Sequence, residues 1–197
     1  MDCDLTLRPA ILPSFISLIV ITLPDTFPGE TTVLNKLFAE SGLRLLHLRK
    51  PCLSERETEG WIRQIRPEFR RSIVLHDHFN LARQYGLRGI HLNNRNPDVP
   101  AWLNRGDFTL SHSCHSTEEV GRVQEDYDYV FLSPVFDSIS KPGYKAAFTR
   151  ERLAEARDIL SRNVYALGGI TFERLGEVRD MGFFGAAMMG GFWESKQ

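Results

Sequence analysis

Cysteine is scarce in this 197-residue sequence, and a strong net charge of either sign is absent. The three cysteines, Cys3, Cys52 and Cys114, form no C-x-x-C pair, so we expect neither a disulfide framework nor a thiolate zinc site. The 24 basic and 25 acidic residues leave a net charge of −1, which gives no basic surface for a nucleic-acid partner. The cysteine usage predicts a reducing, cytoplasmic setting.

Long hydrophobic runs and a secretion signal are also missing. The apolar stretch from Phe15 to Leu23 is too short to span a membrane. Asp2 and Asp4 precede the first basic residue, Arg8, which is the wrong order for a signal peptide. We therefore predict no membrane partner, and we treat residues 1–13 as an N-terminal extension outside the fold.

Short apolar runs and helical segments alternate along the rest of the chain. Eight runs lack strict alternation, which is typical of strands buried on both faces of a parallel sheet. Their predicted ranges are 16–21, 43–48, 72–75, 87–92, 107–113, 129–132, 164–167 and 184–189. Seven helical segments separate them, among them 31–41, 80–85, 149–160 and 171–181, and a short helix near Trp193 comes last. Ser54 with Glu57, and Ser116 with Glu119, have helix-capping spacing. Residues 14–197 are predicted to form one α/β domain.

The residues at the strand ends decide between a closed barrel and an open, doubly wound sheet. About 23 residues per βα unit is tight for a barrel, whose usual size is about 250 residues. Yet polar residues or glycines end seven consecutive strands, and in a barrel these ends converge on one mouth. They are His47 and Arg49, His76 and Asp77, His91 and Asn93, Ser113 and His115, Ser133 and Pro134, Gly168 and Gly169, and Gly190 and Gly191. We therefore predict a compact (β/α)8 TIM barrel.

All six histidines lie between positions 47 and 115. A zinc or two-metal site is one interpretation of His76-Asp77-His78 and of His112-x-x-His115. However, His76 and His78 share a face only if the strand continues that far, and residues three apart point to opposite sides of an extended strand. Satisfied or surface histidines fit His78 and His112 better.

Ser111, Ser113 and His115 share one face of the fifth predicted strand. Histidine titrates near pH 6.5, so His115 can take and give a proton at neutral pH. The helix that begins at Ser116 can tune the imidazole and attract an anion. Cys114 points to the opposite face, which argues against a Cys–His nucleophile pair. His115 is a predicted catalytic residue, and Ser113 a predicted substrate-binding one.

Two glycine pairs come directly after the last two predicted strands. Gly168–Gly169 and Gly190–Gly191 allow backbone N–H groups to approach a ligand, at the place where barrels commonly hold phosphate. A tight turn explains either pair alone, but two pairs on neighbouring strand ends predict a phosphate-binding cup. Arg49 and Lys141 are candidate cations for the same ligand, with solvated surface charge as the alternative.

Seven segments occur in an order and spacing that resemble one family. They are His47-Leu48-Arg49-Lys50, Leu75-His76-Asp77, Gly89-Ile90-His91-Leu92, Ser111 to Ser116, Asp128 to Phe136 with Ser140-Lys141, Ala166 to Ile170, and Gly185 to Gly191. Together they resemble the thiamin-phosphate synthase and TenI superfamily from about residue 15 onward. The resemblance implies a β/α barrel, a homodimer, and action on a phosphorylated thiazole in thiamin biosynthesis.

The resemblance implies one of two reactions. The synthase joins hydroxymethylpyrimidine pyrophosphate to thiazole phosphate, with Mg²⁺ held by acidic residues. The TenI-like tautomerase aromatises thiazole carboxylate phosphate by proton transfer, with a histidine after the fifth strand and no metal. His47 stands where the synthase has glutamine, and Pro51 where it has lysine. His76 replaces its asparagine and Asn96 its second metal aspartate, although Asp77 remains.

These departures favour the tautomerase. One carboxylate with an amide is a poor cage for Mg²⁺, whereas proton transfer needs no metal. We predict a thiazole tautomerase with His115 and His47 as catalytic residues and no cofactor. Asp77 would bind Mg²⁺ only in the synthase alternative. A non-catalytic barrel that binds a thiamin intermediate is the third possibility.

Overall fold

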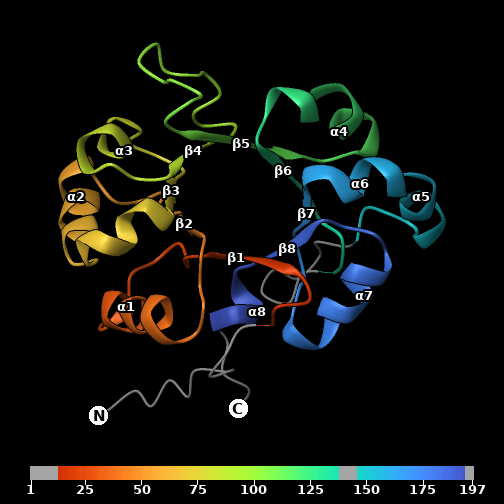
Figure 1. The fold of residues 1–197 in the computed structure, drawn as a ribbon, viewed down its shortest axis with the longest axis horizontal. Coiled ribbons are helices and arrows are strands. Elements are labelled where there is room, and N and C mark those ends of the chain that lie inside the picture. Colours follow the sequence, from red (N-terminus) through yellow and green to blue (C-terminus); the bar gives the residue numbers. More distant parts are fainter. Residues whose placement is uncertain (1–12, 138–145, 194–197) are drawn as a thin grey trace.

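Eight parallel strands close into a barrel in the computed structural model, which describes residues 13–137 and 146–193 (Figure 1). Each strand pairs with its neighbours in the chain, and β8 pairs with β1. The strands are β1 (Ser17–Ile21), β2 (Leu46–Leu48), β3 (Ile73–Leu75), β4 (Gly89–Leu92), β5 (Thr109–Cys114), β6 (Tyr129–Leu132), β7 (Val164–Ala166) and β8 (Gly185–Met188). The predicted (β/α)8 barrel is confirmed.

The helices form an outer ring around the strands in Figure 1. They are α1 (Glu30–Glu40), α2 (Glu55–Arg63), α3 (Asn80–Tyr85), α4 (Thr117–Val123), α5 (Arg150–Glu155), α6 (Arg157–Asn163), α7 (Leu175–Asp180) and α8 (Gly190–Trp193). Three 3₁₀ turns accompany them at Pro67–Ser72, Gln124–Asp126 and Phe172–Arg174. In the described part of the chain, every helix falls short of the length and hydrophobicity that crossing a bilayer requires.

Local capping fixes where two helices begin, as the sequence predicts. The Ser54 hydroxyl accepts from the Glu57 N–H, and the Glu57 carboxylate accepts from the Ser54 N–H at 2.8 Å, which completes a capping box. The Ser116 hydroxyl accepts from the Glu119 N–H at 3.1 Å. The helix predicted at 149–160 is wrong in one respect, because α5 and α6 are separate helices that meet at Ala156.

Side chains on the two faces of the sheet have different surroundings. Outward-facing side chains pack under the helices in two large apolar clusters. Inside the barrel, an apolar group occupies one part of the interior: Ile19, Ile21, Tyr129, Phe131, Tyr165 and Ala187. The inward side chains of β2 to β5 are instead largely polar and include His47, His91 and Ser111, all buried. The fold therefore places polar groups inside the barrel, below the ends of neighbouring strands.

Candidate functional site

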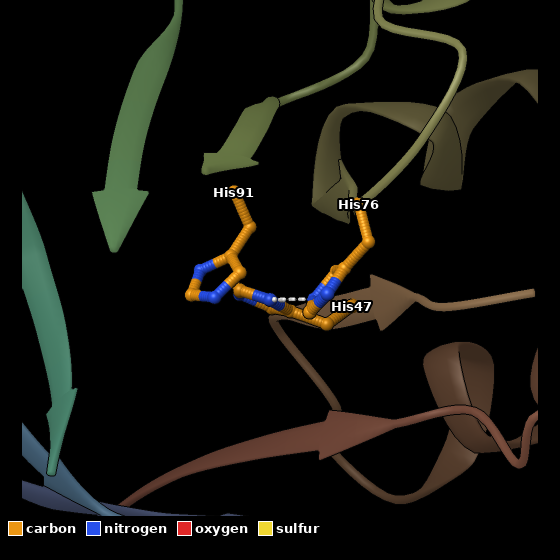
Figure 2. A group of neighbouring side chains, drawn as sticks. All are labelled: His47, His76 and His91. Carbon is orange, nitrogen blue, oxygen red and sulfur yellow. Dashed lines mark hydrogen bonds between the residues drawn. The ribbon is translucent and has the colours of Figure 1, made fainter. Parts of the chain in front are cut away.

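Three histidines from consecutive strands meet inside the barrel (Figure 2). His47 lies in β2, His91 in β4, and His76 directly after β3. All three are buried: the exposed fraction of the residue is 0 % for His47, 1 % for His91 and 5 % for His76. The ring centroids are 5.1 Å apart for His47 and His76, 5.3 Å for His47 and His91, and 4.4 Å for His76 and His91. We call these residues the histidine cluster.

Hydrogen bonds occupy most of the nitrogens in the histidine cluster. His47 Nδ1 lies 2.9 Å from His76 Nε2, and His47 Nε2 lies 2.7 Å from the Tyr129 hydroxyl. His91 contacts the hydroxyls of Ser111 and Ser113, each at 2.9 Å. Burial is the main cause that lowers the pKa of all three imidazoles, and the pKa of His91 falls to about 3. The cluster is therefore neutral at physiological pH.

The histidine pairs suggested by sequence proximity do not form. His78 Nε2 instead bonds to the Leu53 carbonyl at 2.8 Å, so it is a satisfied histidine as expected. His112 stacks on Tyr127, with ring centroids 5.1 Å apart, rather than joining His115. The better signal was that three consecutive predicted strands each end with a histidine. Reading it required the strand register, which pairs Val74 with Gly89 and so places His76 beside His91, two residues further along each strand.

His47 lies deeper than a residue that touches substrate at the mouth. Both of its ring nitrogens have partners, and none of its surface is exposed. Any catalytic role would have to act through His76 or Tyr129. The assignment of His47 as a catalytic residue stays a prediction.

His115 lies at the mouth, one residue beyond β5, and is exposed. Its Nδ1 is 3.1 Å from the Ser133 carbonyl, and its backbone N–H donates to Glu119 at 2.8 Å. Because a carbonyl only accepts, this contact puts the ring proton on Nδ1 in the neutral imidazole. Nε2 then carries the lone pair and can act as a base. Ser113, two residues earlier, points into the barrel toward His91.

Of the two cations predicted for the anion site, Arg49 and Lys141, the structure describes Arg49. It lies one residue beyond β2 and is half-buried, and burial lowers the pKa of its guanidinium, with a smaller effect from the nearby Arg95. Within residues 13–137 and 146–193, its guanidinium makes no hydrogen bond or ion pair, so its donors are available to an anion. Lys141, the other predicted cation, lies outside the described residues.

Asp77 is engaged by protein donors. Arg95 reaches both carboxylate oxygens, with contacts of 3.0–3.2 Å, and the Asn96 side-chain amide donates at 2.8 Å. Among the described residues, Asp77 belongs to no group of three metal ligands. Mg²⁺ needs several oxygen ligands and favours carboxylates. The residues present therefore do not fit the magnesium ion that the synthase reaction implies.

The glycines at the mouth are required by close chain packing. Gly168 and Gly169 have φ of 96° and 62°, the left-handed region that glycine adopts without strain. A Cβ on Gly168 would lie 2.8 Å from the Pro134 Cα, and one on Gly191 would collide with the Ile170 carbonyl. The tight-turn explanation therefore holds for Gly168 and Gly169, whereas Gly191 lies in α8 and is confined by the close approach of Ile170.

The same turns also leave backbone donors unused. In the described part of the chain, no hydrogen bond is donated by the N–H groups of Gly168, Gly169, Gly190 or Gly191. The first pair is next to His115, because Gly168 packs on Pro134 and His115 bonds to the neighbouring Ser133. Two of these donors lie near His115, and all four are compatible with the predicted phosphate cup, which stays a prediction.

The closed barrel and its polar mouth define a (β/α)8 protein of the kind whose active site is built from the loops after the strands. Residues 18–192 match the TMP-TENI family model, described as thiamine monophosphate synthase. The chain therefore belongs to the thiamine monophosphate synthase family. The predicted family is confirmed, whereas these matches do not specify its TenI branch.

Relatives of known name agree with this family. The chain is 30 % identical over 151 residues to the thiamine-phosphate synthase of Caldicellulosiruptor bescii, covering 73 % of this chain and 68 % of the relative. The crystal structure of thiamine phosphate pyrophosphorylase from Bacteroides thetaiotaomicron is 40 % identical, with a TM-score of 0.82, covering 92 % of this chain and 87 % of that one. The Pyrococcus furiosus thiamine phosphate pyrophosphorylase structure, 20 % identical with a TM-score of 0.69 over 89 % and 86 % of the chains, shares the fold.

Proposed function

We propose that this protein is a metal-independent thiazole tautomerase, which moves a proton on a phosphorylated thiazole of thiamine biosynthesis. The observation that carries the proposal is the state of Asp77, whose carboxylate is held by Arg95 and Asn96. In the described part of the chain, the carboxylate that would hold Mg²⁺ is already engaged by Arg95 and Asn96, whereas proton transfer needs only an oriented acid–base group.

The mechanism uses the position of His115. Nε2 removes a ring-bound proton from the thiazole tautomer, and the imidazolium that forms returns this proton to another atom of the same skeleton. No redox partner is needed, and the imidazole ends in its starting state. The Ser133 carbonyl keeps the ring in one orientation through both transfers.

Substrate binding is assigned to the surrounding donors. The N–H groups of the two glycine pairs, which donate to no acceptor in the described part of the chain, would hold the phosphate. The guanidinium of Arg49, unpaired among the same residues, would bind an anionic group of the substrate. Lys141, outside the described residues, stays a further candidate cation from the sequence. Anchoring the phosphate at one place lets the short proton transfer repeat with the same geometry.

Thiamine-phosphate synthase is the second candidate, and the names of the relatives favour it. In that reaction Asp77 would have to leave Arg95 to hold Mg²⁺, and Arg49 would face the pyrophosphate. Both reactions act on a phosphorylated thiazole, so binding alone does not separate them.

Assays of both reactions, with and without a chelator, separate the candidates. We expect aromatisation of the thiazole at a rate that changes less than about twofold when divalent ions are removed, since the acid–base group is a side chain. Thiamin phosphate formation that requires Mg²⁺ and is abolished in Asp77→Ala would assign the synthase instead. Phosphate-dependent binding with no turnover in either assay would indicate a non-catalytic barrel.

A further inference from the structure

We propose that the histidine cluster, His47, His76 and His91, is a binding site for one borderline divalent transition-metal ion, of which Zn²⁺ is the type. The site lies inside the barrel, and the proton transfer proposed above for His115 does not use it. The ion would join the three consecutive strands β2, β3 and β4 through one imidazole each.

The spacing of the rings fits a single ion. Each histidine offers one nitrogen, and these nitrogens lie within 4.8 Å of one another. Imidazoles bound to one tetrahedral zinc ion at ~2.0–2.1 Å have ring centroids roughly 5 Å apart. The three centroid separations of 4.4, 5.1 and 5.3 Å bracket that value. His47 Nδ1 and His76 Nε2, only 2.9 Å apart, already point at each other in Figure 2.

The groups around the cluster match the second layer of a metal site. A ligating histidine normally forms a hydrogen bond through its other nitrogen, which fixes the ring. The Tyr129 hydroxyl contacts His47 Nε2, so Nδ1 can ligate in the tautomer whose ring proton lies on Nε2, with the ion in place of the His76 contact. His91 has a serine hydroxyl at each nitrogen and can exchange one of them for the ion while it keeps the other.

The donor set also determines the class of ion. Three neutral imidazoles suit zinc, copper, cobalt or nickel, whereas Mg²⁺ and Ca²⁺ require oxygen ligands. Among the described residues, no fourth histidine, cysteine or carboxylate belongs to this group. The fourth position therefore belongs to water or to a small anion.

A second group of metal-ligating residues provides the internal comparison. His112, Cys114 and Glu119 lie together outside the barrel, beside α4. Burial raises the pKa of the Cys114 thiol to about 12, which opposes the thiolate that a metal needs. The cluster inside the barrel requires no such deprotonation at neutral pH.

The test is metal binding by the untagged full-length chain after chelator treatment and dialysis. We expect one Zn²⁺ per chain by competition with a chromophoric chelator, and Co²⁺ absorption bands of nitrogen ligation. His47→Asn, His76→Asn and His91→Asn should each weaken binding by at least about 10²-fold, beyond the 10–100-fold that loss of a second-layer partner causes. His78→Asn and Cys114→Ser are the matched controls and should bind as the unmodified chain does.

A further variant separates loss of zinc binding from loss of the fold, because it keeps the packing inside the barrel. Tyr129→Phe removes only the hydroxyl that orients His47, and we expect it to bind Zn²⁺ about 10–100-fold more weakly. Zn²⁺ should also raise the Tm of the unmodified chain but not that of the histidine variants. Failure of the unmodified chain to bind Zn²⁺ would overturn the proposal. So would binding that Cys114→Ser abolishes and the cluster variants retain.

Discussion

At the scale of single residues, the proposed proton transfer depends on an imidazole that the backbone orients. His115 donates a hydrogen bond from Nδ1–H to the Ser133 carbonyl, so one nitrogen is fixed as a donor and the other is left as a base. Its exposure keeps it accessible to a ligand, in contrast to the histidine cluster. One fold thus holds histidines in two different environments.

Replacing His115 by glutamine tests the proton transfer directly. Glutamine can still donate to the Ser133 carbonyl, but its amide cannot take a proton at neutral pH. We expect His115→Gln to lower turnover of the thiazole by about 10²–10⁴, the usual contribution of a positioned acid–base group, with KM changed only a few-fold. Steady-state kinetics measures both quantities, with His78→Gln as the control. A loss of less than about tenfold would remove His115 as the proton carrier.

Residue-level prediction from the sequence succeeded where local spacing was enough. The period of two along a strand brought Ser111 and Ser113 onto one face, and both reach His91. It did not identify the partners of His76, because these come from other strands. Contacts between β2, β3 and β4 depend on the register of a closed barrel, which no short motif records.

At the scale of elements, a buried ion pair ties α1 to the segment after β2. Lys50 Nζ lies 2.7 Å from the Glu30 carboxylate, with 1 % and 2 % of the two side chains exposed. Trp61 of α2 donates to the same carboxylate at 3.0 Å, and Lys50 also donates to the Asp25 carbonyl. Burial lowers the pKa of Lys50, an effect that the Glu30 contact opposes. Each charge therefore depends on its partner.

Removing one charge should expose that dependence. We expect Lys50→Met to lower the free energy of unfolding by ~3–5 kcal/mol, because the Glu30 carboxylate is left buried and unpaired. Urea unfolding measures the change, and Glu30→Gln in the same chain should recover most of it. Lys36→Met is the control, since the exposed Lys36–Glu40 pair contributes less than ~1 kcal/mol. Equal losses in the two lysine variants would contradict this account.

Helix starts were predictable from the sequence, but helix breaks were not. A capping residue and its partner three positions on are local, and both Ser54 and Ser116 begin helices as predicted. The break at Ala156 has no local mark, since the segments on either side bury Leu153 and Leu160 in one cluster. Docking of both segments on the barrel decides it.

At the scale of the whole molecule, the barrel interior is divided between apolar and titratable groups. Aromatic and aliphatic side chains occupy one part, and the histidine cluster occupies the part formed by β2 to β4. The folded state keeps these imidazoles neutral, because burial lowers the pKa of each. An unfolded chain exposes them at their ordinary pKa of about 6.5. This difference makes the stability of the whole barrel depend on pH.

Proton uptake sets the sign of that dependence. Above about pH 6.5 both states are neutral at these positions, and the contribution to stability is complete. As the pH falls below that value, the unfolded state binds up to three protons that the folded state does not bind. This difference persists until the pH reaches the folded pKa values, about 3 for His91. Each imidazole then costs ~1.4 kcal/mol per pH unit. We expect urea unfolding of the chelated protein to show ~4 kcal/mol less stability at pH 5.5 than at pH 7.5, above the range where carboxylates titrate.

The control for this acid sensitivity is His78→Asn, which removes a histidine outside the cluster and should leave the loss unchanged. His91→Asn should reduce the loss by about one third, since one of three equivalent protons is removed from the balance. Saturating Zn²⁺ should raise the stability at both pH values and leave the loss unchanged, because the folded cluster is already neutral and zinc binding displaces no proton from it. Stability that stays constant between pH 7.5 and 5.5 would mean that the folded chain also protonates the three imidazoles. The conclusion that the cluster inside the barrel is neutral would then be wrong.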